Sequence, residues 1–413
     1  MVVGSLRSVE IADWIGRRNT IVLALVTSYA AVTPEFIATT NEMSFGGKFL
    51  NGFAVGALQA VCATYIGEIV PLALRGLMTC LIALAYTLGP FNSLPHRKQR
   101  GGMSSPDGLS GPILKRSPWW LASKGHDEKA LRSLKRLESN ATHDQTVKRL
   151  AKIKVTLEEI RREIEGVTYL ECFRQSNLRR TIVSIPPLII QQFTGIVFAA
   201  SYSTYYAQLA GYSTDMSFKL QVTQQVLSIF GNIIAWYLID KVGRRDLTLY
   251  GTILLTAILW IMGGLAVGGS QEQLRGAVAM ILLYCFFYNV SIGATVYTCL
   301  TETATSRLRV KTIAIGLASA NSISVMWSFV LPCLLNPDRA NLGGKLGFIF
   351  GELCFPSIMF IWWYQPETRE RSYEELDEML EKVPARQFKG YKTETETLGV
   401  VARVAQDGNA KSV

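Results

Sequence analysis

One short charged motif occurs twice in this chain and could form ion pairs that close and open a passage. Asp13–Arg18 reads Asp-Trp-Ile-Gly-Arg-Arg, and Asp240–Arg245 reads Asp-Lys-Val-Gly-Arg-Arg. Downstream of each copy comes a Glu with an Arg seven residues on. The charged residues of interest are Asp13, Arg17, Arg18, Glu68, Arg75, Asp240, Arg244, Arg245, Glu302, Arg309 and Glu367. Bridges from the arginines to Glu68, Glu302 and Glu367 would need a coupling of only about 1–3 kcal/mol to act as a switch. The alternative is that the arginines only set membrane topology.

Amide side chains within apolar stretches offer a second kind of chemistry. Gln191 and Gln192 are adjacent, and an amide inside a membrane is costly unless it has a partner. Amides suit the neighbouring hydroxyls of a sugar, while hydrogen bonding between helices is the alternative. Tyr205 follows on the same stretch and could stack on a sugar or line a helix interface. Asn321 and Asn232 are further polar candidates, with helix packing as the alternative.

The elements that must position these residues are long apolar stretches. Of the 413 residues, 49% are hydrophobic and 18% are charged, whereas soluble domains carry about 25% charge. A helix of roughly 20 apolar residues crosses a bilayer. About nine stretches of that kind lie near 19–38, 47–69, 77–94, 182–206, 220–239, 246–268, 276–300, 312–335 and 345–364. The pattern predicts an all-α, multi-pass membrane protein in contact with the lipid bilayer.

The remaining composition argues against several other classes. The net charge of +10 comes from Lys and Arg in short loops beside apolar stretches, which is typical of membrane topology and not of a nucleic-acid partner. The seven Cys are scattered, and the three His all fall in one polar segment. We therefore expect no metal site, no cofactor and no catalytic residues, and the chain is not expected to be an enzyme.

The chain divides into four parts. We expect a truncated N-terminal transmembrane bundle over 1–94, a cytoplasmic linker with short helices over 95–180, a six-helix transmembrane bundle over 181–364, and a cytoplasmic tail over 365–413. Helical spacing predicts short helices at Leu131–Leu137, Leu157–Ile164 and Ser372–Lys382, and we expect disorder after about Tyr391. If both charged motifs face the cytoplasm, the number of spans between them is wrong by one. Either one of the early stretches does not span, or a span is missing between about 90 and 117, and the polar segment Pro90–Arg116 favours the second.

Seven motifs in this order resemble the sugar porter branch of the major facilitator superfamily, and within it the fungal α-glucoside (maltose-type) proton symporters. They are Asp13–Arg18, Tyr65–Gly76, Ser117–Leu121, Gln191–Gly195, Asp240–Arg245, Glu302–Arg309 and Pro366–Arg369. The resemblance covers roughly residues 10–95 and 117–390. Counted against the twelve helices of that family, the chain lacks helix 1, most of helix 2 and helix 6, so we expect about nine.

The resemblance implies two pseudo-symmetric bundles around a site at the membrane midplane. Gln191 and Gln192 match the substrate motif of helix 7, and Asn289 and Tyr297 match the sugar contacts of helix 10. Val197 stands where glucose carriers place an Asn, so the site is expected to differ from theirs. Ala83 likewise stands where helix 5 commonly offers a polar side chain.

We therefore expect a monomeric transporter of the fungal plasma membrane that takes up an α-glucoside such as maltose together with protons. Proton coupling in the relatives uses an acid on helix 1, which this chain lacks. Glu35, near the outer end of the first span, is at a position that suits solvent better than proton transfer. Two alternatives remain open. One is a non-transporting truncated or pseudogene-derived relative, and the other is a sugar-sensor-like membrane protein.

Overall fold

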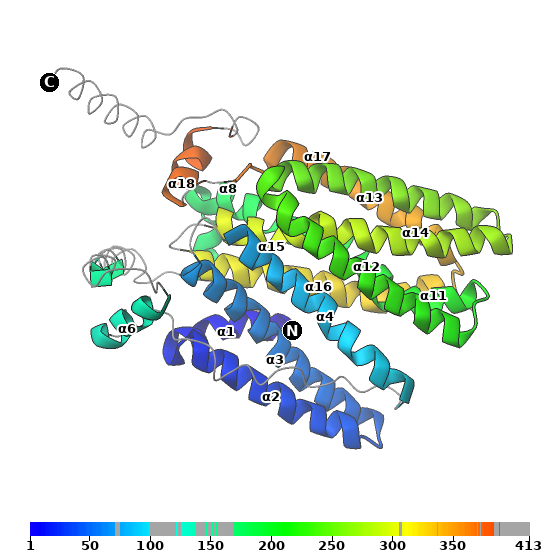
Figure 1. Ribbon diagram of the computed structural model, residues 1–413, viewed down its shortest axis with the longest axis horizontal. Helices are drawn as coiled ribbons and strands as arrows, with labels where there is room; N and C mark the ends of the chain where they lie inside the picture. Colours follow the sequence, from blue (N-terminus) through cyan, green and yellow to red (C-terminus); the bar gives the residue numbers. More distant parts are fainter. Residues whose placement is uncertain are drawn as a thin grey trace.

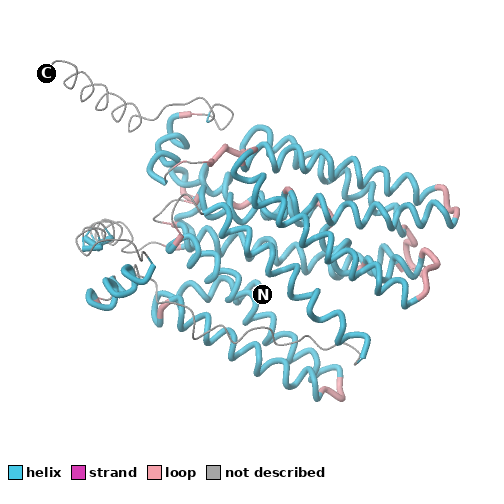
Figure 2. Tube along the Cα trace, viewed as in Figure 1, coloured by secondary structure: helices cyan, strands magenta, loops and turns pink. Residues whose placement is uncertain are grey.

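The structure is a computed structural model that describes residues 1–70, 75–99, 121–122, 125–137, 146–147, 150–151, 153–154, 168–304, 308–336, 338–369, 371, 373–383 and 388. All regular elements within these ranges are helices, and the long ones run side by side with loops at the two ends of the bundle (Figure 2). The all-α fold predicted from the sequence is confirmed.

Four helices make up the N-terminal group: α1 (Val2–Ile15), α2 (Arg17–Ile37), α3 (Asn41–Ile69) and α4 (Arg75–Gln99). α2 packs along α3, and α1 packs between α3 and α16 (Arg309–Leu335). Thr40 starts α3 by accepting the Met43 backbone N–H on its side chain. Figure 1 shows this group, in blue and cyan, along one side of the bundle.

The C-terminal group contains the other long helices: α12 (Thr214–Lys241), α13 (Arg244–Val267), α14 (Gln271–Val290), α15 (Ile292–Thr303), α16 and α17 (Leu346–Tyr364), with the short η4 (Gly343–Lys345) before α17. α13 packs against α14 and α17, and α12 packs against α14. The largest buried apolar core lies in this group. The two groups meet where α4 contacts α12 and α15, and where α16 contacts α1 and α3.

Six of the nine predicted spans are helices long and apolar enough to cross a membrane, among the residues that the structure describes. The span predicted near 19–38 is α2, and the one near 77–94 is α4, which continues to Gln99. Large apolar side chains such as Phe230, Tyr250 and Phe329 are exposed on the outside of these helices. A lipid-facing surface requires such side chains.

The stretch near 182–206 is not the single continuous helix that was predicted. It consists of α8 (Gln175–Ser184), α9 (Pro186–Phe193), α10 (Ile196–Ser201) and α11 (Ser203–Leu209). Pro186 begins α9 because proline lacks the N–H that would continue α8. Gly195 breaks the next turn with a φ of 88°, and Tyr202, with a φ of −115°, separates α10 from α11.

Two of the predicted short helices outside the bundle are confirmed. α6 (Asp127–Leu137) contains the predicted helix in the middle segment, and α18 (Tyr373–Lys382) is the predicted tail helix. Arg179 of α8 holds the end of α18 by donating to the Leu380 and Val383 carbonyl oxygens, the latter at 2.6 Å. The predicted helix at 157–164, the segment 100–117 and the tail after Tyr391 lie outside the described residues.

Candidate functional site

The first copy of the charged motif forms an ion-pair cluster between α1 and α2. Gly16 joins the two helices with a φ of 91°, which residues with a side chain rarely adopt. Arg17 Nη1 lies 2.5 Å from Asp13 Oδ1, and Arg17 Nε lies 3.2 Å from Glu68 Oε1. The same Nη1 donates to the Ala12 carbonyl oxygen at 3.0 Å. The cluster therefore ties together α1, α2 and the end of α3.

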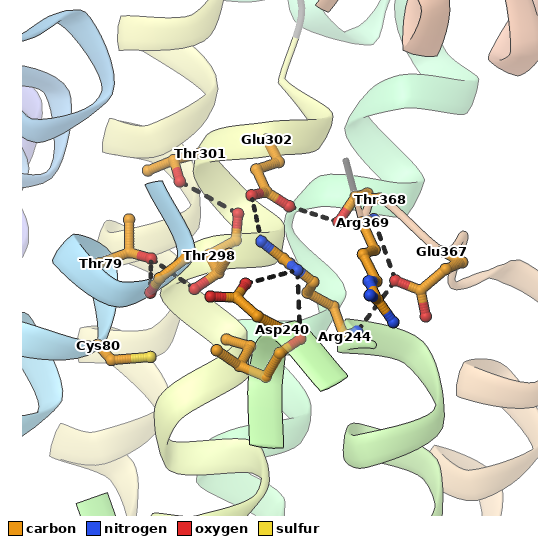
Figure 3. Close-up of polar contacts among 12 residues, drawn as sticks. Thr79, Cys80, Asp240, Arg244, Thr298, Thr301, Glu302, Glu367, Thr368 and Arg369 are labelled. Atoms are coloured by element: carbon orange, nitrogen blue, oxygen red, sulfur yellow. Dashed lines mark hydrogen bonds and ion pairs between the residues drawn. The ribbon is translucent and has the colours of Figure 1, made fainter. Parts of the chain in front are cut away.

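The second copy repeats this arrangement between α12 and α13 (Figure 3). Gly243 has a φ of 102°. Arg244 Nη1 lies 3.1 Å from Asp240 Oδ1, and Nη2 lies 3.4 Å from Glu302 Oε1. Nη1 also donates to the Ile239 carbonyl oxygen at 3.2 Å. The Arg244 and Glu302 side chains are each only 4% exposed, so water screens their attraction far less than it would at the surface.

Glu367 covers the start of α13 in this second cluster. Its carboxylate accepts the backbone N–H of Arg244 at 3.0 Å and that of Arg245 at 3.2 Å. A negative charge at a helix N-terminus satisfies free N–H groups and favours the helix dipole. The neighbouring Thr368 donates its hydroxyl to Glu302. The segment after α17 is therefore bonded to both the helix start and the buried ion pair.

α4 brings the N-terminal group against this cluster. Gly76, in the first turn of α4, allows a close approach, since a Cβ there would lie 2.7 Å from a guanidinium nitrogen of Arg244. One turn further along, the buried hydroxyl oxygens of Thr79 and Thr298 lie 2.6 Å apart and share a hydrogen bond (Figure 3). The ion-pair end of the bundle, where α2 and α13 begin, is thus closed by direct contact between the two groups.

The short helix η3 (Tyr169–Phe173) adds a further contact at this end. The Tyr169 hydroxyl donates to the Leu6 carbonyl oxygen of α1 at 2.7 Å, and Lys311 of α16 lies 5.8 Å from the centroid of its ring. Burial raises the pKa of Tyr169 to about 12, and the negative charges of Glu10 and Asp13 act in the same direction. The hydroxyl therefore keeps the proton that this bond requires at neutral pH.

Two of the predicted charged residues, Arg245 and Arg18, do not take part in the ion pairs that the structure describes. The Arg245 side chain donates from Nη2 to the Trp362 carbonyl oxygen at 2.8 Å and not to a carboxylate. Arg18 Nε is buried without a hydrogen-bond partner among the described residues. Arg309 begins α16, and the side chain of Arg75 lies outside the described part.

A polar cluster joins the two groups of helices away from the ion-pair end. Asn321 of α16 donates from Nδ2 to Gln59 Oε1 of α3 at 3.2 Å, and Gln59 Nε2 donates to the Tyr86 hydroxyl of α4. The Tyr86 ring stacks on that of Tyr297 of α15, with centroids 6.2 Å apart and planes 16° from parallel. This chain of contacts crosses from one group to the other twice.

Asparagines extend the cluster on its other side. Asn232 of α12 donates from Nδ2 to Asn289 Oδ1 of α14 at 3.2 Å and lies 3.5 Å from Thr87 Oγ1 of α4. Gln191 of α9 lies close enough to Tyr288 of α14 for the two polar side chains to interact. We call this set the amide cluster, and its members are Gln59, Tyr86, Thr87, Gln191, Asn232, Tyr288, Asn289, Tyr297 and Asn321. These groups can exchange hydrogen bonds with a polyhydroxylated molecule, because each is uncharged and each can donate or accept.

The predicted sugar-contact residues are thus only partly brought together. Gln191, Asn289, Tyr297 and Asn321 belong to the amide cluster, and Gln192 follows on α9 with its side chain partly exposed. Tyr205 lies apart, on α11, where its hydroxyl donates to Asn336 Oδ1 at 3.1 Å just after the end of α16.

Four members of the amide cluster were not predicted from the sequence: Gln59, Tyr86, Thr87 and Tyr288. Gln59 is an amide within an apolar span, which is the signal that identified Gln191. Tyr86 lies one helical turn after Ala83, the position noted for its missing polar group, so a search one turn along that helix face would have found it. Among the described residues, the structure places no group of His, Cys, Asp and Glu that could hold a metal ion.

Comparisons with known proteins identify the family to which the chain belongs. Residues 1–93 and 109–380 match the family described as sugar (and other) transporter. A maltose permease of Saccharomyces cerevisiae is 30% identical over 405 residues, which cover 92% of this chain and 66% of that protein. An alpha-glucosides permease of Saccharomyces cerevisiae (strain YJM789) is 30% identical over 418 residues, which cover 95% of this chain and 69% of that protein. The chain spans about two thirds of the length of these curated relatives.

Solved structures show the same fold. The proton:xylose symporter XylE bound to 6-bromo-6-deoxy-D-glucose superposes with a TM-score of 0.74 at 20% identity, covering 92% of this chain and 86% of that one. XylE of E. coli in a partially occluded inward open conformation gives a TM-score of 0.68 at 18% identity, and the match covers 90% of this chain and 87% of that one. With the family match over most of its length, this multi-pass membrane protein has the major facilitator fold and belongs to the sugar (and other) transporter family.

Proposed function

We propose that this chain carries a sugar across a membrane by alternating access, and that the sugar is an α-glucoside such as maltose. The observation that supports this most is the amide cluster, because uncharged donors and acceptors from both groups of helices meet there. A sugar bound between the groups would exchange these internal hydrogen bonds for bonds to its own hydroxyls. The relatives named maltose and alpha-glucosides permease supply the substrate class.

The proposed mechanism assigns the ion-pair end to the cytoplasmic gate. Arg17 and Arg244 sit at equivalent places in the two groups, and each holds two acids. Loops rich in Lys and Arg face the cytoplasm. Opening the gate would break the Thr79–Thr298 bond and separate Gly76 from Arg244, while a sugar-bound cluster would favour one of the two arrangements. A ligand can shift such an equilibrium only by its difference in affinity for the two states.

We propose that uptake occurs at the plasma membrane and is coupled to protons, on the strength of the resemblance to proton symporters. The test is uptake of labelled maltose by yeast that lacks its own maltose permeases and expresses these 413 residues, with surface expression measured in the same cells. Saturable uptake that an uncoupler abolishes supports both parts. Saturable uptake that resists the uncoupler supports transport and contradicts the coupling.

A matched variant makes this test specific to the proposed site. Gln191→Leu removes an amide from the cluster with little change in side-chain size, whereas Tyr205→Phe removes a hydroxyl that lies apart from the cluster. Uptake should fall in the first and persist in the second. Surface-expressed protein without any uptake would favour the alternative of a non-transporting or sensor-like relative.

A further inference from the structure

A second polar region lies within the C-terminal group, behind the broken segment that contains α11. A small cavity there is lined from α11, α12 and α14 by five polar side chains, Ser203, Thr204, Ser217, Gln221 and Gln224, and by apolar side chains that include Val278 and Ile281. No member of the amide cluster lines it. Its size fits about one water molecule.

Three oxygen atoms of the lining side chains are buried without a hydrogen-bond partner among the described residues. They are Ser203 Oγ, Gln221 Oε1 and Gln224 Oε1. Gln224 is only 3% exposed and Ser203 9%, so bulk water does not satisfy them. In folded proteins nearly all such groups are hydrogen-bonded to protein or to ordered water. An unpaired buried oxygen is unfavourable because no new hydrogen bond replaces those it made to water.

The two other polar side chains of the cavity, Thr204 and Ser217, do not belong to this set of three free oxygens. Ser217 also lines the cavity, but its hydroxyl donates to the Ser213 carbonyl oxygen at 3.0 Å within α12. The remaining set is two amide oxygens, which only accept, and one hydroxyl, which can donate. The complementary ligand has two hydrogens to donate and a lone pair to accept, and it must be small.

We propose that one ordered water molecule occupies this cavity and bridges Ser203 of α11 to Gln221 and Gln224 of α12. The water donates one hydrogen to each amide oxygen and accepts the Ser203 hydroxyl, so every free oxygen gains a partner. Polar cavities that offer two to four partners hold water, whereas purely apolar ones stay dry.

The position of this water gives it a role at the break in the helix. Gln224 donates from Nε2 to the Ala199 carbonyl oxygen at 2.9 Å, in the last turn of α10, so the same side chain holds the break and contacts the water. α11 has only seven residues between the break at Tyr202 and Gly211, which has a φ of 84°. A water-mediated contact can be remade at a slightly different distance, which lets so short a helix shift against α12 without leaving a buried oxygen unpaired.

The test is X-ray radiolytic footprinting of the 413-residue chain in lipid nanodiscs, read by mass spectrometry. Hydroxyl radicals formed from a bound water oxidise the side chains beside it, even where bulk solvent does not reach. Ile281 lines the cavity and is 3% exposed, and Ile258 of α13 is a matched reference at 4% exposure that does not line it. The proposal expects Ile281 to be oxidised faster than Ile258. Equal rates at the two isoleucines would overturn it.

Two variants separate the bridging oxygens from general effects on folding. Gln221→Leu removes one of the acceptors, and oxidation of Ile281 should fall to the level of Ile258. Ser217→Ala changes the same cavity but leaves the three free oxygens in place, so Ile281 should stay at the wild-type rate. An equal loss in both variants would contradict the bridge. The comparison within the wild-type chain does not depend on whether either variant folds or on whether the protein transports sugar.

Discussion

Thr79 of α4 and Thr298 of α15 share a 2.6 Å hydrogen bond across the buried contact between the two groups of helices. Both side chains are fully buried, and they lie one turn from Gly76, where α4 approaches the Arg244 cluster. A hydrogen bond between two neutral hydroxyls contributes only about 0.5–1.5 kcal/mol. A bond of this strength is compatible with the proposed gate, which would have to break it during transport.

Cross-linking tests this contact directly. In a Cys80→Ala background, the Thr79→Cys/Thr298→Cys pair should form a disulfide under mild oxidant, because the native hydroxyls already touch. The cross-link should stop sugar uptake, and reduction should restore it. Each single cysteine variant serves as the control and should keep its activity after oxidation. A pair that never cross-links, in the presence or absence of maltose, would contradict the placement of this gate.

Arg244 should be among the most sensitive positions for stability. Arg244→Ala removes the guanidinium that pairs with Glu302, which is 4% exposed, and loss of one partner of a buried ion pair costs about 3–5 kcal/mol. Arg7→Ala is the matched surface change, since Arg7 and Glu10 are 66% and 57% exposed, and it should leave the stability nearly unchanged. Thermal unfolding in detergent compares the two. Similar melting temperatures would show that the Arg244 pair is not buried.

Gly243 should not tolerate a side chain. Gly243→Ala would place a Cβ 2.3 Å from Glu367 Oε2 at a φ of 102°, so the carboxylate that covers the start of α13 would have to move. Loss of such a cap costs about 0.5–2 kcal/mol, and the backbone strain adds to it. Gly264→Ala, inside the same helix with nothing within 4 Å, should be neutral or slightly stabilising. Thermal unfolding of the two variants tests this prediction. Equal melting temperatures would contradict the close contact between Gly243 and Glu367.

Gln191 and Tyr205 were both predicted to contact sugar, and the structure separates them. Gln191→Leu should weaken sugar binding by about tenfold, which corresponds to one lost hydrogen bond of roughly 1.4 kcal/mol. Tyr205→Phe should leave the KM for maltose unchanged, because its hydroxyl bonds Asn336 just after the end of α16, apart from the amide cluster. Uptake kinetics at matched surface expression measure both. A rise in KM for Tyr205→Phe alone would move the site towards α11.

Local patterns predicted the helices and the charged clusters well, for a physical reason. The Gly in each copy of the motif ends one helix, and the Arg after it lies four residues from the Asp, so the spacing alone brings the two charges together. In both halves the Glu partner stands seven residues before an Arg, and this recurrence made the pairs of Arg17 with Glu68 and of Arg244 with Glu302 predictable. The fold class followed from the length of the apolar stretches.

The amide cluster could be predicted only in part, because its contacts join helices that are far apart in the sequence. Asn321 and Gln59 are 262 residues apart, and no periodicity in either helix specifies that contact. The break at Tyr202 was also missed, since nothing in its residue type forbids a continuous helix there. The conformation at Tyr202 depends on neighbours such as Gln224 of α12, whose side chain donates a hydrogen bond to the Ala199 carbonyl oxygen.

Uptake of labelled maltose by permease-deficient yeast that expresses these 413 residues tests the central claim most directly. The account predicts saturable uptake that an uncoupler abolishes and that Gln191→Leu reduces, with Tyr205→Phe at the level of the unmodified chain. Protein that reaches the cell surface and takes up neither maltose nor any other α-glucoside would contradict the claim that this chain is a transporter.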